Sequence, residues 1–304
     1  MKDSQENIPQ KHHFIPQFII RNFSHNKFGF SKYYDKKRGS FINTPTAEIF
    51  MYKNLYSVQI ERDFSKYESQ IAKLIKEKFL TQDDIKLSNA EYESLLLYLA
   101  LSPFRSRHAL DFFKKTISEE SKEFYLKYQN DGDFVSMWRR NLGEIVNCRS
   151  MGEVMKNPNI DPPFKLFMRR DSYGLFGSYL IVAERRGGED FFLSDTYPVS
   201  IEGESKIGSI PLLRFFPISP NRIIILTDNN IKLAPLEVRY FSDDFLRAPI
   251  ILQNKVGYSI HVKKIYKKDV EFINNIFFKH TKEGLVVLDE ERFFVDGRDV
   301  KKFS

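Results

Sequence analysis

The sequence is poor in cysteine, with Cys148 as the single example among 304 residues. One thiol forms neither an internal disulfide nor a thiolate metal cage, so disulfide-stapled scaffolds and cysteine zinc sites are excluded. Glycine and proline are also scarce, at 14 and 13 residues. These counts exclude collagen-like and low-complexity chains. A globular chain of this length buries roughly 70–75% of its unfolded surface, so it needs no covalent staple.

Long hydrophobic runs and targeting signals are missing as well. No apolar run approaches the ~18 residues of a membrane span, and the polar start lacks the apolar core of a secretory signal. We therefore expect a cytoplasmic protein without a membrane partner, and a disordered N-terminus over residues 1–10.

The common cofactor motifs do not occur. The sequence has no phosphate-binding P-loop, dinucleotide fingerprint, Gly-x-Ser-x-Gly elbow or Cys/His zinc spacing. We expect no nucleotide cofactor.

Charge and aromatic residues are plentiful. Lys and Arg total 47 against 40 Asp and Glu, giving a net charge of +7, and 15% of the residues are aromatic. This composition excludes a disordered chain. A modest positive excess permits an anionic partner such as nucleic acid, but solubility accounts for it equally well.

The first half of the chain shows helical periodicity after a short entry. Two aromatic runs around a basic turn predict a hairpin over 28–41. An apolar stripe from Tyr67 to Phe79 predicts a helix, and Ser88 with Glu91 forms a capping-box signature before another that Pro103 ends or kinks. Further helices are expected over 108–128 and 134–155, with a break at 131–133.

Strand-like patterns dominate after residue 157. Alternating or solid apolar runs predict strands over 179–183, 191–193, 223–226 and 285–288, and a late helix is expected over 268–280. Helices followed by strands predict an α+β fold, in which an N-terminal hairpin and helical half packs against a mainly antiparallel β half with a late helix. We expect residues 11–304 to form one domain, whose helix-rich part 11–156 and strand-rich part 164–304 are joined by a Pro-rich linker over 157–163.

Two adjacent histidines open the most polar segment, His12-His13-Phe14-Ile15-Pro16-Gln17. Pro16 biases Ile15 toward an extended conformation, so His12 and His13 are expected to point to opposite faces. A neutral imidazole can ligate a metal or accept a proton near pH 7. The alternative is structural, with one histidine bonded to the backbone and the other exposed.

This segment, followed by Arg21-Asn22-Phe23, resembles the opening signature of a mainly bacterial family catalogued as domain of unknown function 4238. Further stretches fit that family in order over about residues 11–290: Glu68 after Phe64-Ser65-Lys66, Arg105 after Ser102-Pro103-Phe104, Ser194-Asp195-Thr196-Tyr197-Pro198, Phe216-Pro217-Ile218-Ser219-Pro220, and Asn274 or Asn275. Two features depart from the pattern. Thr196 and Tyr197 both stand between Asp195 and Pro198, where one residue is expected, and Ser102 replaces a frequent Gln.

The resemblance implies a fold and no established activity. It does select polar residues whose burial without partners would cost free energy, so we expect them to contact one another or a ligand. The candidate catalytic residues are His12, His13, Arg105 and Asp195. The candidate ligand-binding residues are Gln17, Arg21, Glu68, Asn274 and Asn275. His12 and Asp195 are the candidate ligands of a divalent metal, Mg²⁺ or Mn²⁺.

The phrase His-His-x-x-Pro also resembles the first motif of the ββα-metal nucleases of the HNH type. That resemblance would make His12 a metal ligand and His13 the base. The further His or Asn ligand that this fold needs on a nearby helix has only Asn43 or Asn54 to supply it, so a true site of this type is disfavoured.

Two classes of function fit these residues. The first is a metal-assisted phosphodiesterase or nuclease-like hydrolase, in which a metal or Arg105 steadies the phosphate and a histidine activates water. The family resemblance suggests a setting in phage defence for it. The second is a non-catalytic module that binds a phosphate-containing ligand or nucleic acid, with the His/Arg/Asp residues as a structural network.

Overall fold

The structure is a computed structural model of the chain. It describes residues 11–24, 29–53, 55–105, 110–111, 113–115, 117, 121–128, 130–173, 178–205, 208–228, 252–254, 257–295 and 298–299. The expected disorder of residues 1–10 lies outside these ranges, as does part of the helix expected over 108–128.

The two long helices at the centre of the first half begin at serine side-chain caps. The helix α2 (Val58–Leu74) is capped by Ser57 and continues into the π turn η2 (Ile75–Phe79). The helix α3 (Asn89–Leu101) has the full Ser88–Glu91 capping box, as predicted. Its side chains from Leu95 to Leu101 are all buried, so it lies in the centre of the protein. Pro103 follows in the 3-10 turn η3 (Ser102–Arg105) and ends the regular helix.

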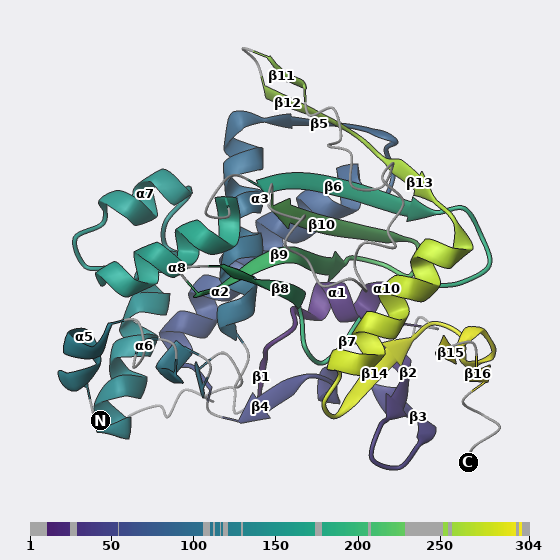
Figure 1. The fold of residues 1–304 in the computed structure, drawn as a ribbon, viewed down its shortest axis with the longest axis horizontal. Helices are drawn as coiled ribbons and strands as arrows, with labels where there is room; N and C mark the ends of the chain where they lie inside the picture. Colours follow the sequence, from purple (N-terminus) through teal and green to yellow (C-terminus); the bar gives the residue numbers. More distant parts are fainter. Residues whose placement is uncertain are drawn as a thin grey trace, which may run out of the picture.

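The described helices between η3 and residue 178 gather on one side of α2 and α3 (Figure 1). They are α5 (Lys122–Leu126), α6 (Asp131–Val146), α7 (Met151–Lys156) and α8 (Pro162–Tyr173). The break expected at 131–133 lies a few residues earlier, after α5: the Asn130 side chain accepts a hydrogen bond from the Gly132 amide, so residues 131–133 start α6. The short helix α1 (Gln17–Asn22) belongs to the entry segment.

A five-stranded sheet forms the largest β layer, in the order β13-β6-β10-β9-β8. Its strands are β6 (Ser178–Arg185), β8 (Val199–Ser205), β9 (Gly208–Pro217), β10 (Arg222–Asp228) and β13 (Lys263–Ile265). All its pairings are antiparallel except that of β13 with β6.

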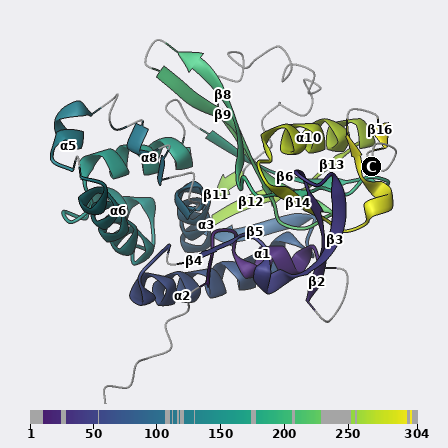
Figure 2. The same ribbon diagram turned by 90° about the horizontal axis from the view of Figure 1, so that it is seen from below.

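Both faces of this sheet are covered, which explains its solid apolar runs. Successive residues of β6 pack into different clusters: Leu180 and Val182 join the core around α3, whereas Ile181 and Ala183 join the core around α10 (Lys267–His280). Figure 2 shows α10 on one side of the sheet and α1 and α2 on the other.

Two smaller sheets combine strands from both halves of the chain. One has the order β3-β2-β14-β7 and another the order β11-β12-β5, and the pairs β1-β4 and β15-β16 complete the described strands. Their bounds are β1 (Lys11–His13), β2 (Phe30–Asp35), β3 (Ser40–Pro45), β4 (Met51–Lys53), β5 (Asp84–Ser88), β7 (Leu193–Ser194), β11 (Leu252–Asn254), β12 (Gly257–His261), β14 (Gly284–Val287), β15 (Phe294–Val295) and β16 (Arg298–Asp299). The 3-10 turns η1 (Thr46–Glu48) and η6 (Glu290–Arg292) lie between them.

The fold is α+β, as predicted, but the division into two halves needs correction. The early strands β2 and β5 pair with the late strands β14 and β12, so the halves share their sheets. The expected linker over 157–163 is also too long, because Pro162 and Pro163 begin α8. Proline suits the first turn of a helix, where its missing N–H needs no partner. Helical structure thus extends to Tyr173 rather than stopping near 156.

Candidate functional site

The two histidines lie on β1, which pairs with β4 so that His12 faces Tyr52 and His13 faces Met51 in register. As expected for a strand, the two rings have different surroundings. His12 is 1% exposed, and its Nδ1 accepts a hydrogen bond from the Tyr56 amide at 3.0 Å. His13 is half-buried. The acceptor role of Nδ1 requires neutral His12 with its proton on Nε2.

His13 begins a polar ladder along α1. The Gln17 amide nitrogen lies 3.3 Å from the His13 Nε2, and the Gln17 Oε1 accepts from Arg21 Nη2 at 2.7 Å. The helix α1 starts directly after Pro16. Gln17 and Arg21 are four residues apart on it, so their side chains lie on the same face. Burial lowers the pKa of His13, and the charges of Arg105 and Arg21 lower it further, against hydrogen bonds to the backbone at Ala47 and Thr46. The ring is therefore held in the neutral form that a proton acceptor needs.

Arg105 binds the backbone of β1 from inside the protein. Its side chain is 3% exposed, Nη2 donates to the His13 carbonyl at 3.0 Å, and Nη1 forms an ion pair with Glu68. The guanidinium carbon lies 4.4 Å from the centre of the Phe64 ring. The Arg105 carbonyl accepts from the Tyr56 hydroxyl at 2.6 Å. Tyr56 therefore links His12, through its amide, to the backbone that carries Arg105.

A second carboxyl group, Glu61, lies beside this pair. Glu61 and Glu68 are two turns apart on α2, and both interact electrostatically with Arg105. The Glu61 Oε2 is buried and has no hydrogen-bond partner among the described residues; the same holds for the Arg105 Nε. Burial raises the pKa of both Glu61 and Glu68, and Arg105 offsets this only in part.

The balance of charge explains these directions. Burial opposes the charge of Arg105, but the surrounding acidic groups, Glu68 first, raise its pKa, so the guanidinium stays protonated. One positive charge faces two carboxyl groups in a desolvated site. Two carboxylates that share one cation favour retention of a proton by the pair.

Two tyrosines complete the cluster. The hydroxyls of Tyr98 on α3 and Tyr197, just after β7, interact with each other and with the charge of Arg105. Burial raises the pKa of both phenols, so both remain protonated donors. We name the set His12, His13, Tyr56, Glu61, Glu68, Tyr98, Arg105 and Tyr197 the Arg105 cluster.

The structure gives the other predicted residues different contacts. Both carboxylate oxygens of Asp195 accept from the amides of residues 282–284, in the turn after α10 and at the start of β14. The buried side chain of Asn274 donates to the Asp190 carbonyl at 2.7 Å and accepts from the Phe192 amide at 3.1 Å. Asn275 lies next to it on α10, half-buried. These contacts of Asp195 and Asn274 hold α10 to the strands, and in the motif around Asp195 it is Tyr197 that reaches the Arg105 cluster.

The predicted metal pair does not fit the donors as they lie. The Nδ1 of His12 is used by the Tyr56 amide, and the Asp195 oxygens are used by three backbone amides. Across the described residues, no group of three or more His, Cys, Asp or Glu side chains is arranged to hold a metal ion. A metal site in proteins normally joins several such donors.

Sequence reasoning missed Glu61, Tyr56 and Tyr98. A usable signal existed for Glu61, because it lies seven residues before Glu68 and therefore on the same face of a helix. Tyr56 and Tyr98 carry no such signal, because their roles depend on tertiary contacts made by the backbone amide and hydroxyl of one and the hydroxyl of the other.

These observations define an α+β protein with a buried His/Glu/Arg/Tyr cluster beneath a half-exposed histidine. The chain belongs to the family described as "Protein of unknown function (DUF4238)", whose model matches residues 11–291. No curated protein matches the chain, and neither does any solved structure. None of the helices in the described ranges is long and apolar enough to cross a membrane.

Proposed function

We propose that the protein is a phosphodiesterase, most simply a nuclease-like hydrolase, with His13 as the general base. The observation that carries the proposal is the state of His13: its ring is half-buried and its pKa is shifted toward the neutral form, and its backbone carbonyl accepts a hydrogen bond from Arg105. A neutral imidazole can remove a proton from water, and a neighbouring guanidinium favours the binding of an anion beside it.

In the proposed reaction, Arg21 binds the non-bridging phosphate oxygens, because it is exposed and positioned by Gln17. His13 removes a proton from water, the hydroxyl oxygen bonds to phosphorus, and the bond from phosphorus to the leaving oxygen breaks. Glu61 in its protonated form supplies the proton that the leaving oxygen takes up. The raised pKa of Glu61 favours that form. Arg105 and Glu68 are positioning residues in this scheme.

The substrate class is a phosphate diester, and the net charge of +7 suits a nucleic acid. A cytoplasmic location and a role in phage defence remain part of this proposal, on the family resemblance and the composition. No step passes through a Mg²⁺ or Mn²⁺ ion, since His12 and Asp195 use their donors elsewhere. Turnover is expected to persist in a chelator.

The test compares wild type with His13→Ala on single- and double-stranded DNA, RNA and bis(4-nitrophenyl) phosphate, each with EDTA, Mg²⁺ or Mn²⁺. We expect His13→Ala to lose about 10²–10⁴-fold in turnover, as when a general base is removed. The matched control is His261→Ala, because His261 is 71% exposed and pairs with Asp84 on β5. Equal background in wild type and His13→Ala under all conditions would remove the hydrolase proposal.

The second candidate, a non-catalytic module that binds nucleic acid or another phosphate-containing ligand, is favoured by one observation. The two Nη groups of Arg105 bond to Glu68 and the His13 carbonyl, which is what a structural network requires. Under this alternative, wild type binds a labelled oligonucleotide without cleaving it, and Arg21→Gln weakens binding while His13→Ala does not.

A further inference from the structure

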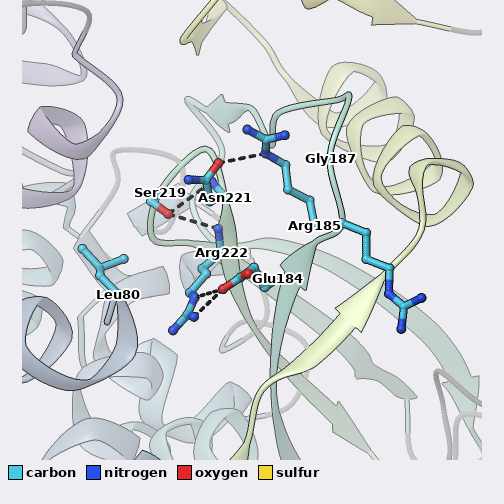
Figure 3. A pocket seen from close by; sticks show the side chains of 8 residues that line it. Leu80, Glu184, Arg185, Gly187, Ser219, Asn221 and Arg222 are labelled. Atoms are coloured by element: carbon cyan, nitrogen blue, oxygen red, sulfur yellow. Dashed lines mark hydrogen bonds and ion pairs between the residues drawn. The ribbon is translucent and has the colours of Figure 1, made fainter. Parts of the chain in front are cut away.

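A cavity of about 460 Å³ lies apart from the Arg105 cluster, at one end of the five-stranded sheet. Its walls come from the end of β6, the turn before β10, and Leu80 after η2. Figure 3 shows Asn221 bonded to Arg185 and Arg222 bonded to Glu184 beside this space, with Ser219 next to Asn221. The two strands are neighbours, with Arg222 opposite Glu184 in register.

Two of the charged lining residues are occupied by structural bonds. Arg222 is 6% exposed, donates to the carbonyls of Phe79 and Gln82 at 2.8 and 2.6 Å, and forms ion pairs with Asp83 and Glu184. Glu184 is also paired with Lys264 at 2.5 Å. Arg222 and Lys264 therefore neutralise the Glu184 carboxylate, so this lining residue does not repel an anion.

The remaining polar lining presents donors. Arg185 donates from Nε to the Asn221 Oδ1 at 2.8 Å and pairs through Nη2 with Asp190 at 2.8 Å. Within the described part of the chain, neither its Nη1 nor the Asn221 Nδ2 forms a hydrogen bond. The Ser219 Oγ accepts from the amides of Asn221 and Arg222 at 3.2 and 3.0 Å, so its own hydrogen remains to be donated.

We propose that this cavity binds a small phosphate monoester, such as a nucleoside monophosphate. A guanidinium, a primary amide and a hydroxyl supply donors from different directions, which suits the several oxygens of a tetrahedral phosphate better than the two of a carboxylate. The cavity exceeds the size of a phosphate ion, and Leu80 gives it an apolar wall for the organic part of the ligand. The site is independent of the hydrolase proposed above.

The experiment measures binding of AMP, ribose 5-phosphate, inorganic phosphate and adenosine to the full chain by isothermal titration calorimetry. The test variant is Asn221→Asp, which replaces an exposed donor by a carboxylate and leaves the core untouched. Its control is Asn43→Asp on β3, another exposed asparagine, because both variants change the net charge equally. A third variant, Arg21→Gln, alters the site near His13.

We expect AMP to bind wild type, Asn43→Asp and Arg21→Gln alike, and Asn221→Asp at least about tenfold more weakly because like charges repel. Inorganic phosphate should compete with AMP, and adenosine should not bind. No AMP binding up to about 10 mM, or equal binding by Asn221→Asp and Asn43→Asp, would overturn the proposal. Loss of binding in Arg21→Gln alone would assign the ligand to the His13 region and overturn it too.

Discussion

Replacement of Arg105 by methionine tests whether the Arg105 cluster is held by charge. Methionine fills most of the volume but removes both Nη donors, and so leaves Glu68 buried without its cation. The cheapest response of Glu68 is to take up a proton. From an ordinary pKa of 4.5 this costs about 1.36 kcal/mol per pH unit, or about 3.4 kcal/mol at pH 7 and about 0.7 kcal/mol at pH 5.

The raised pKa of Glu68 makes these figures upper bounds, while loss of the bond to His13 and of the Phe64 contact adds about 1–2 kcal/mol at any pH. We therefore expect Arg105→Met to lower the free energy of unfolding by about 3–5 kcal/mol at pH 7, in the range for a broken buried pair, and by clearly less at pH 5.

Urea titrations followed by Trp138 fluorescence measure this loss, because the Trp138 ring is buried 5.9 Å from Tyr56. The double variant Arg105→Met with Glu68→Gln should recover most of the stability lost at pH 7, since no buried charge is left behind. Arg140→Met is the control: that side chain is 51% exposed and pairs with Asp161, so its loss should cost at most about 1 kcal/mol. A cost of Arg105→Met that is independent of pH, or a double variant no more stable than the single one, would refute the reasoning.

Three further outcomes are expected. The lowered pKa of His13 means that the unfolded chain takes up this proton before the folded chain does as pH falls below 6.5, so the folded state loses stability there; pH titrations of unfolding should show this loss in wild type but not in His13→Gln. Gly284→Ala should lower the melting temperature by several degrees, since a Cβ there would overlap the Tyr33 ring and the Tyr34 carbonyl, whereas Gly152→Ala, whose nearest neighbour is the Ser150 Oγ at 3.6 Å, should not. Ser88→Ala should cost about 1 kcal/mol in urea titrations through loss of the α3 capping box, and no change would show that the cap is dispensable.

Most of the secondary structure could be predicted because its signals are local. Ser88 and Glu91 predict the start of α3, and the basic turn predicts the hairpin of β2 and β3. The late helix α10 begins within one residue of its expected start. The errors also have local causes. The Pro-rich stretch predicts a linker, although Pro162 and Pro163 suit the first turn of α8 as well as they would suit a loop.

The pairing of strands could not be predicted, and the candidate site depends on it. Nothing local in β5 indicates that it pairs with β12, about 170 residues later, because that choice rests on burial of faces that exist only in the folded chain. The same limit applies to the polar residues. His12, His13, Glu68 and Arg105 do meet, but the sequence does not distinguish them from Asp195, whose carboxylate binds backbone amides instead.

The geometry also separates residues that would act on a substrate from residues that would position them. Arg105 bonds to the His13 carbonyl and not to the ring, so its removal should displace the strand β1 as well as relieve the charge that lowers the pKa of the imidazole. Glu68 acts one step further away, because it holds Arg105. Variants of Glu68 and Arg105 should therefore lose function and stability together, whereas His13→Ala should lose function with little loss of stability near neutral pH. This arrangement requires that, among members of the family, Arg105 and Glu68 change only as a pair while His13 stays fixed.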